Sequence, residues 1–423
     1  MSDTKHILLG PFTQLAPMSK LPLKGPLSDD QLGLIESAGV LISKGYIEAV
    51  GDYKDIKKSM GSTPHEEILL TGNFVGLPGF IDCHTHICFA GSRAKDYAAR
   101  NSGKTYLEIA RAGGGIWDTV RQTRQASEQE LTRLTTSRAT EHLSRGTTTI
   151  EVKSGYGLDP ENELKMLSAI AKANETSPVD LIATCLAAHT IPKDRSLTSE
   201  DYLNEILNEL LPEVKSRSLA SRVDIFIEEG AFKPAESIAY VQKAKEMGFE
   251  ITIHADQFSV GGSRVAVECG ARSADHLEAS TDQEIELLAQ SDVIPVALPG
   301  ASLGLGCGFT PARSMLDAGG SLAIASDHNP GSAPMGDLVF QAAVLGTMQQ
   351  LSQAEVLAGI TYRAAAALGL TDRGVLEKGK LADLCIYNVA DLNEVLYHQG
   401  SLKPALVLKK GKIEIDLRME AHV

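Results

Sequence analysis

The fold of this chain can be worked out from the stretch Leu77-Pro-Gly-Phe-Ile-Asp-Cys-His-Thr-His86. It opens with the turn signal Pro78-Gly79 and continues into the short run Phe80 to Cys83, which is typical of a buried strand. His84 and His86 follow at the carboxyl end, and side chains two apart on a strand point to the same side. Two neutral imidazoles on one side can share a divalent metal that activates water. The same pattern is common in surface loops, so the rest of the sequence has to show whether this histidine pair binds a metal.

Composition excludes several classes of protein. The 423 residues, 43% of them hydrophobic, suffice for one large barrel or two ordinary domains. A net charge of −14 argues against nucleic acid and against an anionic membrane surface as partners, whereas an anionic small molecule needs only one local arginine. The first residues lack a secretory signal, no apolar run reaches the about 18 residues that span a bilayer, and six scattered cysteines suit reduced thiols. We therefore expect a cytoplasmic protein.

Short apolar runs alternate with helical stretches through the middle of the chain. The candidate strands are Phe80 to Cys83, Thr148 to Val152, Leu181 to Ala187, Val223 to Ile227, Glu250 to Ile253, Ser273 to Asp275, Val293 to Ala297 and Leu322 to Ala325. Eight such repeats over about 300 residues predict an α/β fold, a (β/α)₈ TIM-like barrel. A doubly wound open sheet competes with it, but the glycine run Gly113 to Gly115 neither directly follows a strand nor has the phosphate-loop spacing.

Local signals mark the helix starts and the two ends of the chain. Ser127 with Glu130 predicts a capped helix start, and Thr281 and Ser352 begin the same pattern. Residues 40–50 and 406–415 each read as a β-hairpin, and neither end alone has enough strands to bury a sheet face. We therefore predict a small composite β-sandwich domain from residues 1–78 together with 376–423, beside a hydrolase barrel over residues 79–375.

Polar residues gather where the predicted strands end, which is where barrels of this kind carry their active sites. His84 and His86 end the first strand, and the others are His189 on the third, His254 on the fifth, His276 on the sixth and Asp327 on the eighth. We predict His84, His86, His254 and Asp327 as the ligands of one zinc or iron ion, because imidazole and carboxylate do not separate these metals strongly. Asp82 shares the face of the two imidazoles and is a candidate partner for a ring N–H.

Longer motifs carry a resemblance to a known family. They are Pro78 to His86, Gly91 to Arg93, Gly113 to Ile116, Lys153-Ser-Gly-Tyr-Gly-Leu158, Ala188 to Thr190, His254-Ala-Asp-Gln257, Ala274-Asp-His-Leu-Glu278 and Ser326-Asp-His-Asn-Pro-Gly-Ser332. In this order the chain resembles the imidazolonepropionase family of the amidohydrolase superfamily. The resemblance implies hydrolysis of 4-imidazolone-5-propanoate to N-formimidoyl-L-glutamate in histidine degradation, with a small-molecule substrate as partner. We also expect a homodimer.

The ring-opening reaction asks for a nucleophile, a proton carrier and a group near the oxyanion. Asp327 is placed to accept a proton and pass it to the leaving nitrogen. His276 either polarises the carbonyl, steadies the oxyanion or shuttles protons, and these roles stay open. Arg93 matches the family's clamp for the propanoate carboxylate, since a guanidinium binds such a group in bidentate fashion.

The remaining substrate-binding candidates come from the same resemblance. They are Tyr156, His189, Asn329, Gly331 and Ser332, with Tyr106 as a weaker one. Gln257 stands where many relatives carry Glu, so we assign it to substrate hydrogen bonding rather than to proton transfer. His328 stands where an aromatic residue is common, and we expect it to face away from the metal. Lys153 could be carbamylated to bridge two metals in related enzymes, but its neighbours match a family with a single ion.

Two alternative functions remain. Another amidohydrolase, a deaminase or a dihydropyrimidinase-like ring opener, would use the same metal on a different nitrogen heterocycle. A barrel with a structural metal, or one that binds a ligand without turnover, is the alternative from another class; structural zinc sites usually close with four protein ligands, often cysteines.

Overall fold

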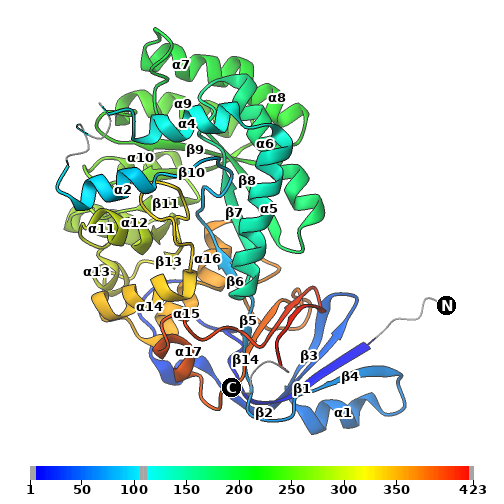
Figure 1. Ribbon diagram of the computed structural model, residues 1–423. Helices are drawn as coiled ribbons and strands as arrows, with labels where there is room; N and C mark the ends of the chain where they lie inside the picture. Colours follow the sequence, from blue (N-terminus) through cyan, green and yellow to red (C-terminus); the bar gives the residue numbers. More distant parts are fainter. Residues whose placement is uncertain (1–5, 105–107, 109–111, 419–423) are drawn as a thin grey trace.

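The computed structural model describes residues 6–104, 108 and 112–418. It contains a barrel and a separate sheet (Figure 1). The barrel strands are β6 Phe80–Asp82, β7 Thr147–Lys153, β8 Asp180–Ala188, β9 Arg222–Ile227, β10 Glu250–Ala255, β11 Ser273–His276, β12 Ile294–Ala297 and β13 Ala323–Ile324. Neighbours in the sequence are neighbours in the sheet, and every pair between them is parallel. This confirms the (β/α)₈ barrel and excludes the open doubly wound sheet.

The barrel closes just beyond the carboxyl ends of its first and last strands. The backbone N–H of Asp327 donates to the carbonyl of His84 at 3.0 Å, and that of His86 donates to the carbonyl of His328 at 2.9 Å. Thr85 and His328 form an isolated parallel bridge. The closure therefore places the predicted ligands His84 and His86 beside the predicted ligand Asp327, although more than 200 residues separate them in the chain.

Helices surround the barrel (Figure 1). They are α2 Ala94–Asn101, α4 Ile116–Gln125, α5 Glu128–Ser144, α6 Pro160–Thr176, α7 Ser199–Glu205, the π-helical turn η2 Ile206–Leu210, α8 Leu211–Ser216, α9 Pro234–Glu246, α10 Gly262–Cys269, α11 Asp282–Ala289, α12 Pro299–Leu305, α13 Ala312–Asp317, α14 Leu338–Gln349, α15 Gln353–Gly359 and α16 Tyr362–Ala367, with α17 Asn393–Tyr397 nearer the C-terminus. The predicted caps are confirmed: the Ser127 hydroxyl accepts from the N–H of Glu130 at 3.1 Å, and Thr281 and Ser352 begin capping boxes. Among the described residues, no helix has the length and apolar character needed to cross a membrane.

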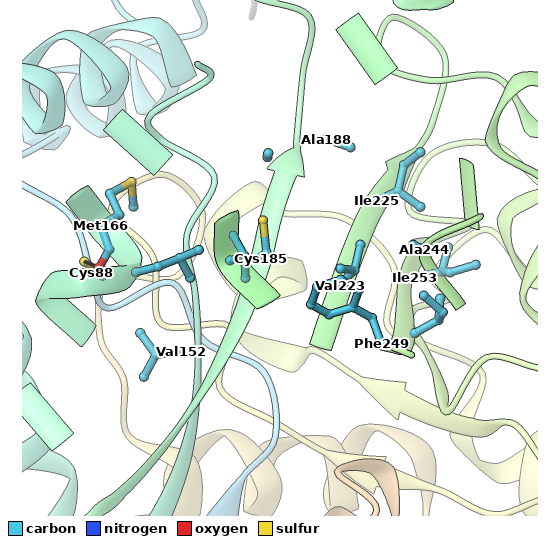
Figure 2. Close-up of a cluster of buried hydrophobic side chains, with 14 of the residues drawn as sticks. Cys88, Val152, Met166, Cys185, Ala188, Val223, Ile225, Ala244, Phe249 and Ile253 are labelled. Carbon is cyan, nitrogen blue, oxygen red and sulfur yellow. Dashed lines mark hydrogen bonds between the residues drawn. The ribbon is translucent and has the colours of Figure 1, made fainter. Parts of the chain in front are cut away.

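Strand residues alternate between the two sides of the barrel wall. In β9, Val223 and Ile225 lie in the apolar layer between strands and helices, together with Ile253 of β10 (Figure 2). Asp224, between the two apolar residues of β9, instead contacts Lys153 from β7. Because successive side chains point to opposite faces of a sheet, β9 contributes apolar residues to the outer layer and a polar one to the interior. The interior near the mouth is therefore polar.

Both ends of the chain contribute to the second sheet. Its strands are β1 His6–Leu15, β2 Ile35–Ser43, β3 Tyr46–Asp52, β4 His65–Leu69, β5 Val75–Pro78, β14 Leu384–Tyr387, β15 Leu406–Lys409 and β16 Lys412–Asp416, with the 3₁₀ turn η1 Asp29–Leu32 and helix α1 Tyr53–Met60 beside them. The two predicted hairpins are β2 with β3 and β15 with β16, and β14 joins the two halves by pairing with β5. The strands expected as a small sandwich form one continuous sheet. The domain boundaries at 78/79 and 375/376 stay a prediction.

Candidate metal centre and active site

Four predicted ligands converge at the carboxyl-terminal mouth of the barrel. The Nε2 atom of His86 lies 3.3 Å from Nε2 of His84 and 3.3 Å from Nε2 of His254. The Oδ1 atom of Asp327 lies 3.7 Å from Nε2 of His84 and 3.5 Å from Nε2 of His86. Ligands about 2.1 Å from a tetrahedral zinc ion stand about 3.4 Å apart. These four separations therefore match those of neighbouring ligands on one ion, and all four side chains are buried. His84, His86 and Asp327 form one group that could hold a metal ion, and His84, His254 and His276 form another.

The protonation of these groups suits a cation. Burial lowers the pKa of His84 and His86 well below the ordinary value and lowers that of His254 to about 3. The imidazoles are therefore neutral at neutral pH, which is the form that binds metals. Burial raises the pKa of Asp327 to about 6, which still leaves a carboxylate at neutral pH. Three facing nitrogen lone pairs and an anionic oxygen fit a divalent ion.

Two carboxylates behind the histidines fix the direction of the rings. The Nδ1–H of His84 donates to Oδ2 of Asp275 at 2.6 Å, and Nδ1 of His254 lies 2.8 Å from Oδ2 of Asp224. Each contact turns Nε2 toward the centre of the site, as second partners of metal-binding histidines commonly do. Sequence reasoning missed both aspartates, although each is an acid inside a short strand and so lies on the polar face of the barrel wall.

Asp82 does not have the role considered from the sequence. Its Oδ1 accepts a hydrogen bond from the backbone N–H of Ser326 at 2.9 Å, and its Oδ2 lies 3.6 Å from Nδ1 of His142. His142 in turn lies 2.9 Å from Nδ1 of His328, through its Nε2. His328 thus faces the helices and not the ligand cluster, which confirms the expected orientation, and Asp82 helps to hold the end of β13.

His276 lies beside the ligand cluster. Its ring centroid is 5.8 Å from that of His84 and 5.3 Å from that of His254. Burial alone would lower the pKa of His276, but the attraction of Glu278, whose Oε1 is 3.4 Å from Nδ1, outweighs it and raises the pKa above the ordinary value. His276 has φ +92° and Asp327 has φ +51°, backbone conformations that are uncommon outside glycine and that cluster at functional sites.

Two further predicted residues border the same space. The ring of His189 stacks on that of His86, with centroids 5.3 Å apart, and its Nδ1–H donates to the carbonyl of Gly155 at 3.0 Å. The ring of Tyr156 lies 5.4 Å from that of His189 and 6.0 Å from that of His86. Both side chains therefore line the approach to the ligand cluster.

The loop after β13 connects the cluster to Arg93. The side-chain amide of Asn329 forms its hydrogen bonds within this loop. Its Oδ1 accepts from the N–H groups of Gly331 and Ser332, and its Nδ2 donates to Ser332 Oγ and to the carbonyl of Asp327. The hydroxyl of Ser332 donates to Oδ2 of Asp327 at 3.3 Å. A Cβ atom on Gly331 would lie 2.5 Å from Nη1 of Arg93. A side chain at position 331 would therefore push the guanidinium away from the loop.

The structure gives a different outcome for each of three further residues singled out from the sequence. Gln257 is half-buried in the loop that follows β10. Tyr106 lies outside the described residues. Lys153 is fully buried among carboxylates; burial alone would lower its pKa, but the attraction of Asp224 and neighbouring acids raises it above the ordinary value. A charged ammonium does not form a carbamate, so the second bridging metal finds no support.

The fold and donor set define a class of proteins, the (β/α)₈ barrels with histidines and an aspartate gathered at the mouth. The chain matches the Amidohydrolase family over residues 75–413. It is 42% identical to an imidazolonepropionase of Bdellovibrio bacteriovorus over 91% of this chain and 90% of that one. It is 38% identical to an imidazolonepropionase of Herpetosiphon aurantiacus over 90% and 91%. The chain belongs to the amidohydrolase family and, within it, to the imidazolonepropionases.

Solved structures with the same fold are more distant in sequence. An atrazine chlorohydrolase from Arthrobacter aurescens, complexed with zinc, superposes with a TM-score of 0.70 at 18% identity over 97% of this chain and 95% of that one. An adenosine deaminase from Xanthomonas campestris with bound zinc has a TM-score of 0.70 at 19% identity, over 98% and 93%. At this identity the likeness shows the fold alone.

Proposed function

We propose that the protein hydrolyses the cyclic amide of 4-imidazolone-5-propanoate to N-formimidoyl-L-glutamate, a step of histidine degradation. One zinc or iron ion would be held by His84, His86, His254 and Asp327. The observation that carries the proposal is the convergence of these four side chains from three distant segments, with their donor atoms at ligand spacing. The membership in the imidazolonepropionases supports the choice of substrate.

The bound ion would supply Lewis acidity, which activates water at neutral pH. Asp327 would be the proton carrier: its carboxylate would take a proton from the attacking water and return it to the leaving ring nitrogen. The hydroxyl of Ser332 holds Oδ2, which leaves Oδ1 toward the histidines.

His276 would act on the carbonyl oxygen. Burial alone would lower the pKa of His276, but the attraction of Glu278 raises it above the ordinary value, and the two ring nitrogens of His276 are the candidate donors. One of them faces Glu278 at 3.4 Å, so the other is free to donate to the oxygen that becomes negative as water adds. This arrangement favours oxyanion stabilisation over proton shuttling among the roles left open by the sequence.

Arg93 would bind the propanoate tail. Its Nε donates to Oδ2 of Asp96 at 2.8 Å, which fixes the guanidinium plane, and Nη1 lies against Gly331. We assign Tyr156 and His189 to the wall beside the substrate ring. Because the amide of Asn329 is fully engaged within its loop, we propose that it holds Gly331 and Ser332 in place, with Gln257 and Tyr106 as further substrate contacts.

The test combines metal analysis with a substrate panel. We expect about one equivalent of zinc or iron per chain, and turnover of imidazolone propanoate but not of guanine, cytosine or hydantoin. Turnover of only the latter compounds would assign the protein to the deaminases or dihydropyrimidinase-like enzymes. Bound metal without turnover of any compound would favour a structural metal or a binding role.

Location and assembly are also proposed. We propose a cytoplasmic enzyme that acts on a small molecule and forms a homodimer. Cell fractionation and light scattering at several protein concentrations test these two points, and a monomer at all concentrations would contradict the second.

A further inference from the structure

Lys153 has no role in the proposed reaction, and it lies at the centre of a buried charged cluster. Its ammonium is fully buried at the end of β7. Nζ lies 2.7 Å from Oε1 of Glu151, 2.9 Å from Oδ2 of Asp224 and 3.9 Å from Oδ2 of Asp275. These acids come from β7, β9 and β11, alternate strands of the barrel, so one side chain joins three parts of its wall.

Each of the three carboxylates reaches a different part of the metal site. Asp275 accepts from Nδ1–H of His84 at 2.6 Å. Asp224 lies 2.8 Å from Nδ1 of His254 and also accepts from the backbone N–H of that residue at 3.2 Å.

The third arm reaches the segment that carries the histidine pair. Oε2 of Glu151 accepts from the backbone N–H of Thr85 at 3.2 Å, and the hydroxyl of Thr85 donates to the carbonyl of Glu151 at 2.6 Å. Thr85 is the residue between His84 and His86. The three arms together therefore reach the rings of His84 and His254 and the backbone between His84 and His86.

We propose that Lys153 is a positioning residue that holds the three histidine ligands at their common spacing through Glu151, Asp224 and Asp275. The inference rests on the proposed metal site. Three buried carboxylates repel one another, and a buried charge without a partner is strongly unfavourable. The ammonium lies within 4 Å of all three carboxylates and draws them inward, so that each can hold its histidine segment.

Position and charge act on the metal in opposite directions, which makes the proposal testable. If Lys153 were only a nearby positive charge, its removal would strengthen the binding of a cation, because like charges repel. If it positions the ligands, its removal weakens binding, since loss of a group that orients metal ligands typically lowers affinity about 10- to 100-fold.

The experiment compares the full-length wild type with Lys153→Met and Lys409→Met. Lys409 is a matched control, because its ammonium is also buried and paired with two acids, Asp180 at 2.8 Å and Asp383 at 2.6 Å, but contacts none of the predicted ligands. Zinc release to an excess of chelator gives a dissociation rate, and the visible spectrum of the cobalt-loaded proteins reports the coordination geometry.

We expect Lys153→Met to release zinc about tenfold faster or more and to change the cobalt spectrum, and Lys409→Met to match the wild type in both. Equal or slower release from Lys153→Met, with an unchanged spectrum, would overturn the inference while leaving the proposed function intact. A wild-type protein that binds neither metal would overturn both.

A second variant covers the case in which Lys153→Met does not fold. Lys153→Met combined with Glu151→Gln removes one charge of each sign, so the net charge of the cluster is unchanged. We expect this protein to fold and still to release zinc faster than the wild type. If the folded double variant released zinc at the wild-type rate, that result would also overturn the positioning role of Lys153.

Discussion

The two ends of the barrel treat buried charge in different ways. At the base, where the strands begin, Asp180 of β8 pairs with Lys409 at 2.8 Å, with Lys410 at 2.9 Å and with Arg373 at 2.6 Å. At the mouth, Nε2 of His86 lies 3.3 Å from Nε2 of His84 and 3.3 Å from Nε2 of His254, and burial keeps all three imidazoles neutral. The base is complete in itself and joins the barrel to β15 of the terminal sheet. The mouth instead gathers side chains that could hold a metal ion.

This difference indicates that the base of the barrel serves stability and that the mouth serves metal binding and catalysis. The ion pairs at the base stabilise the fold, as is general for the amino-terminal face of such barrels. The carboxyl-terminal face carries the chemistry. Substitutions at the mouth should therefore change metal content and turnover, and substitutions at the base should change stability alone. The following predictions test that separation.

The largest effect is expected from His254→Ala at the mouth. Removal of one of three nitrogen ligands should eliminate bound metal and lower kcat/KM by about 1,000-fold or more, because the ion contributes several kcal/mol to catalysis. Metal analysis and steady-state kinetics on the same preparation measure both losses. His398→Ala is the control, since His398 is half-exposed and paired with Glu394 away from the mouth. Retained turnover in metal-free His254→Ala protein would refute the proposed chemistry.

At the base, Lys409→Met should mainly lower stability. It leaves the buried Asp383 and the partly buried Asp180 without one partner, which we expect to cost about 3 kcal/mol of the free energy of unfolding. Urea unfolding followed by circular dichroism gives the difference. Lys412→Met, on the same hairpin but exposed, should cost about 0.5 kcal/mol or less. If metal content also fell in Lys409→Met, the separation between the two ends would be wrong.

Arg93→Ala should affect substrate binding without affecting the metal. Loss of a charge-assisted, bidentate contact is expected to raise KM about 100-fold, with full metal content and a smaller change in kcat. Arg93→Lys should recover only part of the loss, because an ammonium lacks the planar fork. Arg133→Ala, an exposed arginine paired with Glu130, is the control. An unchanged KM in Arg93→Ala would remove the clamp from the proposal.

The smallest effect concerns pH at the base. Burial alone would raise the pKa of Asp180, but Lys409, Lys410 and Arg373 outweigh it and hold the pKa below the ordinary value. A lowered folded-state pKa stabilises the protein above the unfolded pKa of about 4, and the contribution disappears as the pH falls through the folded value. Asp180→Asn should therefore differ from the wild type by a constant free energy above about pH 5, with the gap narrowing in acid. A gap that widens in acid would contradict the assignment.

Much of the barrel could be predicted because its strands are short, regular and separated by capped helices. All eight predicted strands overlap observed ones, and the capping signals at Ser127, Thr281 and Ser352 mark true helix starts. The ligand set could be predicted for a related reason. Residues at the carboxyl ends of parallel strands meet at one edge, so His84 and Asp327 had to be neighbours once the sheet closed.

The supporting groups could not be assigned in the same way. Asp82 lies on the expected strand and next to the histidine pair, yet it bonds to Ser326, whereas Asp275, 191 residues from His84, holds the ring. The choice depends on the stagger between strands and on which side chains share a level inside the barrel. Neither quantity is visible in a single strand.

By itself, the amino-acid sequence determined the number and order of the barrel strands, the two hairpins of the terminal sheet and the residue types at each strand end. These are properties of local periodicity and turn chemistry, which short segments carry alone. The tertiary structure decided which carboxylate supports which histidine and that Lys153 joins Glu151, Asp224 and Asp275. Those pairings arise from closure, because only a closed barrel brings alternate strands to one level in its interior.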